Sequence, residues 1–167
     1  RHAALVLGLI VCAVALVTAY QTMTAPAFLG EVLKMRFGAF APASSGLLQR
    51  LLFVALVLLQ TTPLLMALAA LWRVFGAIAE SGGLDVYTAR SVRTSGLWFG
   101  AAALAMLLST PLLSLVASIG QPTGQRFVSI GVETQHLLAV LLAAVLITLG
   151  HVLALAAEIA DDNRQII

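Results

Sequence analysis

The chain has 167 residues, of which 61% are hydrophobic and only 10% are charged. A soluble domain carries roughly 25% charged residues to solvate its surface, so this composition excludes an ordinary soluble protein and makes the bilayer the solvent for most of the chain. Because a membrane-spanning helix takes about 20 residues, residues 1–167 hold a single transmembrane domain and leave no space among them for a soluble catalytic domain.

Basic residues are few and scattered along the chain. Nine Lys and Arg against seven Asp and Glu give a net charge of +2, and no run of basic residues marks a nucleic-acid-binding surface. We therefore interpret them as anchors at the ends of membrane spans and expect no direct binding of nucleic acid. The single cysteine, Cys12, lies in an apolar segment and can form no disulfide within the chain.

Four long apolar segments determine the predicted fold. Within lipid, every backbone polar group has to be paired inside its own segment, which forces each of these segments into a helix. The first run is longer than the roughly 7 to 15 apolar residues of a signal peptide, so we expect it to remain as a span. The predicted fold class is all-α, an integral membrane four-helix bundle, with spans at residues 3–20, 47–75, 97–119 and 137–157.

The first connection, residues 21–46, contains apolar residues at roughly helical spacing beside charged ones. This pattern predicts a short amphipathic helix lying at the membrane interface in the first outer loop. Its apolar positions are Phe28, Leu29, Val32, Leu33, Met35 and Phe40, and its charged positions are Glu31, Lys34 and Arg36.

The middle connection is predicted to be short and structured. The helical pattern stops at Ser81, Gly82 and Gly83 follow, and Asp85 can cap a helix that begins at Val86. This predicts that the second and third spans extend beyond the membrane as a helical hairpin.

The last connection, residues 120–136, shows an alternating pattern that favours a strand or an irregular loop over a helix. One set of alternate residues is Phe127, Ser129, Gly131 and Glu133, and the other set is Val128, Ile130 and Val132.

The orientation follows from the basic residues near each membrane face. We predict that both termini face the cytoplasm, because three arginines flank the short middle connection. The inner side then holds five basic residues and the outer side four. The inner set is Arg1, Arg73, Arg90, Arg93 and Arg164, and the outer set is Lys34, Arg36, Arg50 and Arg126.

Several polar residues lie inside the predicted spans. Pro63 and Pro111 each remove a helical hydrogen bond, and neighbouring hydroxyls can bond the freed carbonyls. At 1.5 Å per residue, the polar residues of the second and third spans lie about 18 Å from the starts of their helices, and those of the fourth span are expected at a comparable depth. The candidate ligand-binding residues are Gln60, Thr61, Thr62, Ser109, Thr110, Thr148 and His151.

Two interpretations of this polar layer remain open. Ser, Thr and Gln side chains hold helices together, whereas broken helices with polar residues at the midplane form the substrate sites of some transporters. Haem or metal ligation by His151 is a third, less favoured interpretation, because His2 is terminal and His136 lies about 22 Å away on the same helix. We expect no cofactor and no metal site.

Catalytic motifs are missing from the sequence. It contains no glycine-rich phosphate loop, no His-Glu-x-x-His pair, no Gly-x-Ser-x-Gly and no carboxylate pair within a span. We therefore predict that the protein is not an enzyme.

Two segments carry a resemblance to a known family. Residues 84–96, which enter the third span, and residues 158–167 resemble the corresponding stretches of bacterial four-span membrane proteins of domain of unknown function 2975. The family's usual aromatic residue and Glu-Asn pair are replaced here at Leu84, Tyr87 and Thr88. The matching positions are Ala89, Arg90, Arg93 and Gly96 in the first segment, and Asp161, Asp162, Asn163 and Ile167 in the second.

The resemblance implies a multi-pass protein of the bacterial inner membrane with no assigned activity. Members are often encoded beside a small helix-turn-helix regulator, which implies a sensing or regulator-tethering role. From the residues alone, acidic groups at the end of a helix oppose its dipole, and one hypothesis is that Asp161 and Asp162 pair with Arg90 and Arg93. The other, which we favour, is a frayed solvated tail, with the arginines contacting lipid phosphates or a partner's carboxylates.

The sequence thus favours a non-enzymatic membrane protein that acts through partners, as a regulatory or sensory module or as an accessory subunit. The alternative is a small oligomeric transporter or channel-like protein that uses the midplane polar residues. Both hypotheses place the chain in the lipid bilayer, as a homo-oligomer or with another membrane protein. They differ in whether the polar residues line a hydrated cavity or are paired between helices.

Overall fold

The computed structural model describes residues 2–38, 45–81, 86–119, 121–122 and 124–165, without the side chains at 26, 80, 81, 86 and 160–165. Within these ranges the chain forms five helices. The four long ones are also the four that are apolar and long enough to cross a membrane, which confirms the predicted all-α fold and the short helix in the first connection. The helices are α1 (His2–Thr24), α2 (Pro26–Phe37), α3 (Leu47–Ser81), α4 (Val86–Ser118) and α5 (Thr134–Gln165).

The α3–α4 hairpin extends beyond the apolar segments that predicted it. α3 continues to Ser81 and α4 begins at Val86, as the sequence predicted; Gly82, Gly83 and the predicted cap Asp85 lie outside the described residues. With 35 residues, α3 is about 52 Å long at 1.5 Å per residue. That exceeds the roughly 30 Å of a hydrocarbon core, so this helix tilts or projects beyond it.

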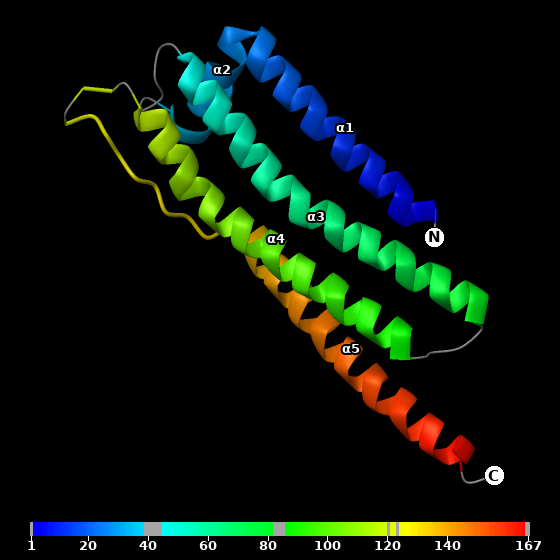
Figure 1. Cartoon of the computed structure of the whole chain (residues 1–167). Coiled ribbons are helices and arrows are strands. Elements are labelled where there is room, and N and C mark those ends of the chain that lie inside the picture. Colours follow the sequence, from blue (N-terminus) through cyan, green and yellow to red (C-terminus); the bar gives the residue numbers. More distant parts are fainter. Residues whose placement is uncertain (1, 39–44, 82–85, 120, 123, 166–167) are drawn as a thin grey trace.

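The long helices pack in the order α1, α3, α4, α5, each against the next (Figure 1). α4 is therefore a central helix with α3 on one side and α5 on the other. Both chain termini lie at the same end of the molecule as the α3–α4 connection (Figure 1), here called the terminal end. The opposite end, where α2 lies, is called the α2 end.

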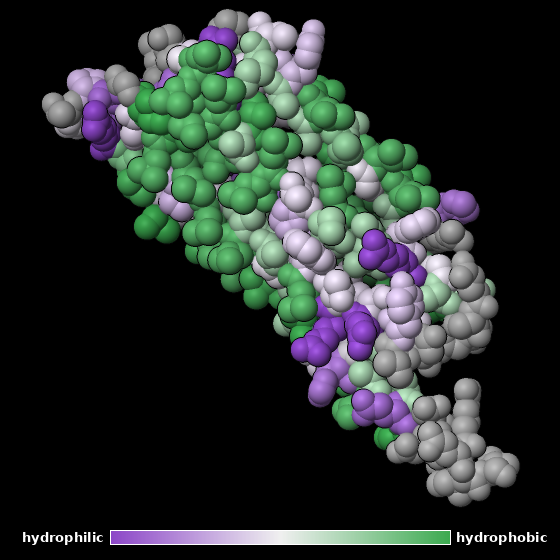
Figure 2. Space-filling view, in the orientation of Figure 1, coloured by the Kyte–Doolittle hydropathy of each residue, from purple (hydrophilic) through white to green (hydrophobic). Residues whose placement is uncertain are grey.

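Most apolar side chains face outward. In the most hydrophobic stretch of each span, only 11% to 28% of the residues are buried inside the protein. Figure 2 shows apolar side chains over most of the visible face, with hydrophilic ones gathered towards the two ends. An exposed apolar surface of this extent is stable against lipid and not against water. The chain is a multi-span membrane protein.

Small residues let α4 and α5 approach closely. A Cβ atom at Gly150 would lie 2.6 Å from the backbone nitrogen of Arg93, and one at Gly96 would lie 2.8 Å from the backbone nitrogen of Ile147. A seven-residue spacing of inward-facing positions is typical of helices that pack side by side over several turns. The buried residues of α5 follow this spacing: His136, Ala143, Gly150 and Ala157.

Helix α2 covers the beginning of α3 and the end of α4. Leu29 and Leu33 are fully buried in a core cluster with Phe53 and Ala117. Leu29 and Leu33 of the predicted apolar face, with Val32 beside them, thus pack on the protein itself, whereas Met35 of the same face is 82% exposed. Phe40, assigned to the same face, lies outside the described residues.

The described residues between α4 and α5 return along α4 without forming a helix (Figure 1). Residues 125–133 are called the return segment. Its side chains alternate as the sequence predicted, and the outward-facing set is strongly apolar. The half-buried residues are Phe127, Ser129, Gly131 and Glu133, and the exposed ones are Val128, Ile130 and Val132.

Gly150→Ala tests the close contact between α4 and α5. The added methyl group would meet backbone atoms of Arg93, which no side-chain rotation can relieve, so we expect the free energy of unfolding to fall by about 1–3 kcal/mol. The matched control is Gly76→Ala on α3, where a Cβ meets nothing within 4 Å and helix propensity improves by roughly 0.5–1 kcal/mol. Thermal unfolding in lipid nanodiscs measures both; equal stability of Gly150→Ala and wild type would contradict this packing.

Candidate ligand-binding cavity

Two serines of α4 hold the return segment. Ser118 Oγ accepts the backbone N–H of Phe127 at 3.1 Å, and Ser114 Oγ accepts that of Ser129 at 3.0 Å. Both serines are buried and lie one turn apart. Backbone N–H groups outside a helix are stable only where protein or water satisfies them. These bonds therefore allow an extended segment to lie along α4 and to deliver Glu133 to the middle of the protein.

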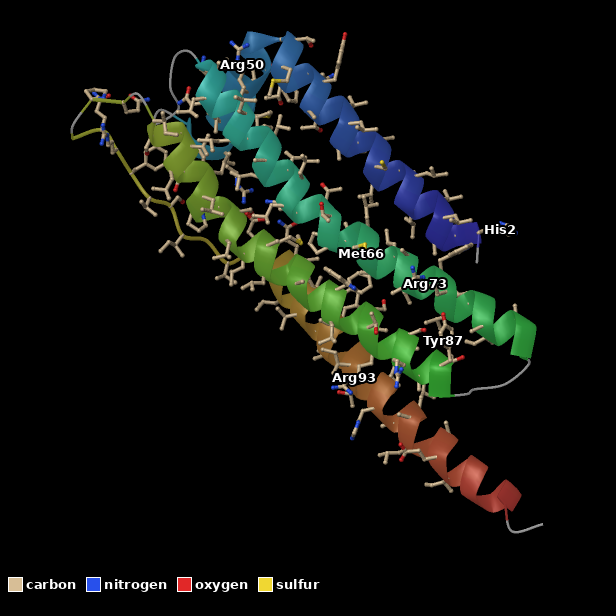
Figure 3. All side chains as sticks on the ribbon, viewed as in Figure 1. His2, Arg50, Met66, Arg73, Tyr87 and Arg93 are labelled. Carbon is tan, nitrogen blue, oxygen red and sulfur yellow. The ribbon has the colours of Figure 1, made fainter. Side chains whose placement is uncertain are left out.

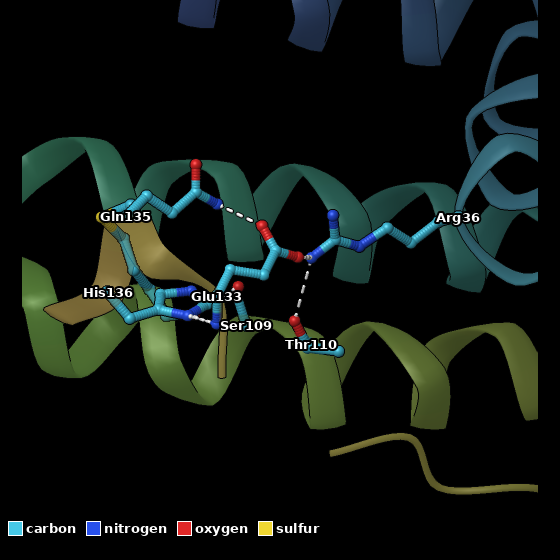
Figure 4. A network of polar contacts seen from close by, with 7 residues as sticks. Arg36, Ser109, Thr110, Glu133, Gln135 and His136 are labelled. Carbon is cyan, nitrogen blue, oxygen red and sulfur yellow. Dashed lines mark hydrogen bonds and ion pairs between the residues drawn. The ribbon is translucent and has the colours of Figure 1, made fainter. Parts of the chain in front are cut away.

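Arg36, in the last turn of α2, is the centre of a polar network (Figure 4). Its guanidinium forms an ion pair with Glu133 and donates a hydrogen bond to Thr110 Oγ1 at 3.2 Å. Gln135 donates to the second carboxylate oxygen of Glu133 at 2.7 Å. The network thereby ties α2 to α4 and to the junction between the return segment and α5.

His136 fixes the beginning of α5. Its Nδ1 accepts the backbone N–H of Glu133 at 2.8 Å, as the third residue of a helix does in a capping box. Because Nδ1 accepts, the ring carries its proton on Nε2. His136 is only 3% exposed, and Nε2 has no hydrogen-bond partner among the residues that the structure describes.

A cavity of about 250 Å³ lies over α4, between α3 and α5. It is somewhat smaller than the roughly 300–1,000 Å³ of a site for a drug-sized molecule, so it fits a small molecule or the head of a larger one. Its polar lining consists of Arg36, Gln60, Ser109, Thr110, Gln135 and His136. Its apolar lining consists of Phe53, Leu56, Val57, Met106 and Leu113.

The lining supplies hydrogen bonds and charge. The Gln60 carboxamide, like His136 Nε2, has no hydrogen-bond partner in the described part of the chain. Ser109 donates to the Met106 carbonyl at 2.6 Å and keeps its lone pairs as acceptors. Within the described residues, no group of three His, Cys, Asp or Glu side chains is placed to hold a metal ion. The arrangement is suited to non-covalent binding of a polar group.

Three of the seven predicted ligand-binding residues come together at this cavity: Gln60, Ser109 and Thr110. The hydroxyls of Thr61, Thr62 and Thr148 do not line it. Each donates instead to the carbonyl four residues earlier in its own helix, at 2.6, 2.8 and 2.9 Å.

The expected depth of Thr148 and His151 was wrong. Antiparallel packing sets Gly150 against Arg93, whereas the Gln60 and Thr110 layer lies beside Glu133, at the start of α5. Thr148 and His151 are therefore some 15 residues from this layer, about 22 Å along α5, and His151 is exposed towards the terminal end. The polar layer is completed by Gln135 and His136 in their place.

The predicted partner or lipid contacts lie at the terminal end. Arg90 and Arg93 are exposed on α4, and Figure 3 places Arg93 and Arg73 towards this end and Arg50 at the α2 end. Asp161 and Asp162 belong to α5, but their side chains lie outside the described residues. Their pairing with the arginines stays a prediction.

Sequence reasoning missed Arg36, Glu133, Gln135 and His136 as site residues. Arg36 and Glu133 are 97 residues apart, so no local spacing joins them. The sequence did hold a weak signal for His136. It follows the capping position Glu133 by three residues, which is the spacing of a capping box, and an apolar run comes after it. The sequence Gly96-Leu-Trp-Phe-Gly100 likewise signals close helix packing.

Comparisons with family models, with curated proteins and with solved structures find no match to this chain. The resemblance to the bacterial four-span family therefore stays a prediction. The function has to be argued from the geometry of the cavity and of the segments that close it.

Ser114→Ala tests how the return segment is held. Loss of the hydroxyl leaves the Ser129 N–H without its acceptor, and an unsatisfied buried N–H costs about 1–3 kcal/mol. We expect faster amide hydrogen exchange in the return segment and a lower melting temperature. Thr148→Ala is the control, because it removes a hydroxyl that bonds only a carbonyl of its own helix; unchanged exchange at Ser129 in Ser114→Ala would contradict the assignment.

Proposed function

We propose that the protein is a non-enzymatic sensory or regulatory membrane module that holds a small ligand in the cavity and reports its presence to partners. One observation carries this proposal. Arg36 lines the cavity and, through Glu133 and Thr110, also ties α2 to α4 and to the return segment. A ligand that reaches Arg36 therefore acts on the same contact that positions these two elements.

The energetics of this contact suit a switch. The side chains of Arg36 and Glu133 are 40% and 41% exposed, and exposed ion pairs contribute roughly 0–1 kcal/mol. A ligand shifts a conformational equilibrium only by its difference in affinity between the two states. A modest preference for the state with a free Arg36 is therefore enough to release α2 from Glu133.

The proposed change is confined to the α2 end. Between α4 and α5, backbone and side chains are in contact at Gly96 and Gly150, which leaves these helices no space to slide.

We further propose that partners bind at the terminal end through Arg90 and Arg93, which face the cytoplasm in the orientation that the basic residues favour. By the family resemblance, the proposed partner is a small helix-turn-helix regulator.

Transport is the second candidate function. The observation in its favour is that Gln60 lies three residues before Pro63 and Ser109 two residues before Pro111, so the cavity adjoins both proline-interrupted turns. Flux of the bound molecule into liposomes, abolished in Gln60→Leu without a loss of thermal stability, would assign the protein to transport.

Native mass spectrometry of the full chain tests whether the cavity holds a ligand. After purification in a gentle detergent, we expect a bound small molecule on the wild type, less of it on Gln60→Leu, and wild-type levels on Thr148→Val, which lies outside the cavity. An adduct retained equally by all three proteins would contradict binding in this cavity.

A distance measurement tests whether ligand occupancy moves the switch. Met35 on α2 and Ile130 on the return segment are both 82% exposed, so spin labels on Met35→Cys and Ile130→Cys in a Cys12→Ala background disturb no core. We expect the separation of the labels to change when the native adduct is stripped by detergent washing and to return when it is added back. A separation that is the same in both states would exclude the sensory function.

A further inference from the structure

The cavity offers several hydrogen-bond donors, among them the charged guanidinium of Arg36. His136, which is 3% exposed, and the half-buried Gln60 line the cavity, and neither His136 Nε2 nor the Gln60 carboxamide has a hydrogen-bond partner among the described residues. Arg36 has five N–H groups, and only one of its nitrogens is used by Glu133 and Thr110. Donors that converge in this way select a ligand group rich in acceptor oxygens.

The rest of the lining is apolar. Phe53, Leu56 and Val57 of α3 face Met106 and Leu113 of α4 across the cavity. Each methylene of a ligand that is buried there improves the affinity by about fourfold. The polar and apolar parts together fit an amphiphile whose head reaches Arg36 and whose chain begins along α3 and α4.

Resting on the proposed function, we propose that this ligand is an anionic single-chain amphiphile and that its carboxylate or phosphate head replaces the Glu133 carboxylate at Arg36. Glu133 is an internal occupant of the anion site: it forms the ion pair that the ligand head would form. Its side chain is 41% exposed, so it has space to turn away from Arg36 when the head arrives. At Arg36, one anionic group then takes the place of another.

Titration of the full chain in lipid nanodiscs with decanoate tests this proposal, with empty nanodiscs as the blank. Arg36→Gln removes the cation and should weaken binding by about 10-fold to 100-fold, as expected for a charge-assisted bond. Glu133→Gln removes the competitor and should tighten binding several-fold, a gain that a folding defect cannot produce. Lys34→Gln is the matched control, because it removes a charge from the same helix outside the cavity and should bind like wild type.

The head group is identified with two further probes. Neutral 1-decanol should bind weakly and without dependence on Arg36 or Glu133. Lysophosphatidate that displaces decanoate, with the same response to both variants, would identify a phosphate as the preferred head; failure to displace it would identify a carboxylate.

The proposal is overturned if 1-decanol binds as tightly as decanoate, or if Arg36→Gln and Lys34→Gln behave alike. If that happens but the native adduct binds to the wild type and is lost in Gln60→Leu, the cavity holds a neutral ligand. The proposed sensory function would then be retained. Absence of both the adduct and any decanoate binding would remove the sensory function as well.

Discussion

Backbone polar groups that no helix pairs need other partners, and the return segment is a stretch of this kind. Ser114 and Ser118 provide the acceptors for its N–H groups. As a result, α5 begins beside Thr110, which is eight residues before the end of α4. A direct turn would start α5 at the end of α4, about 12 Å further along that helix. Beyond Thr110, α4 is covered by the extended return segment instead of by α5. The cavity lies where α5 begins and the return segment ends.

The two ends of the α4–α5 pair are packed differently for a reason visible in their side chains. Towards the terminal end, Gly96 and Gly150 allow backbone contact. Towards the α2 end, the corresponding positions are Thr110 and His136, whose larger polar side chains are buried and line the cavity. α2 then covers this end with Leu29 and Leu33. The inward-facing positions of α4 and α5 repeat every seven residues. They hold Gly96 and Gly150 where the helices are in close contact, and Thr110 and His136 where the cavity lies.

The sequence predicted what local patterns determine. Hydropathy and the glycines gave the four spans and the hairpin from Ser81 to Val86, and the alternation after residue 126 gave the extended return segment. The depth of His151 was wrong because helical rise was counted from an assumed start, whereas depth is set by the register of α5 on α4. The Arg36–Glu133 pair was not predicted, since it depends on how α2 folds back over a segment 97 residues away.

The position of this ion pair also separates the two functions considered. A transporter has to open its site alternately to both sides of the membrane, but backbone contact at Gly150 opposes movement of α5 relative to α4 below the cavity. The proposed switch lies in α2 and the return segment, which the Arg36–Glu133 ion pair connects. On the proposed function, the arrival of a ligand at Arg36 changes how α2 is held. A contact of this kind, beside a pair of helices that cannot slide, favours the proposal that the protein reports a ligand over the proposal that it moves one across the membrane.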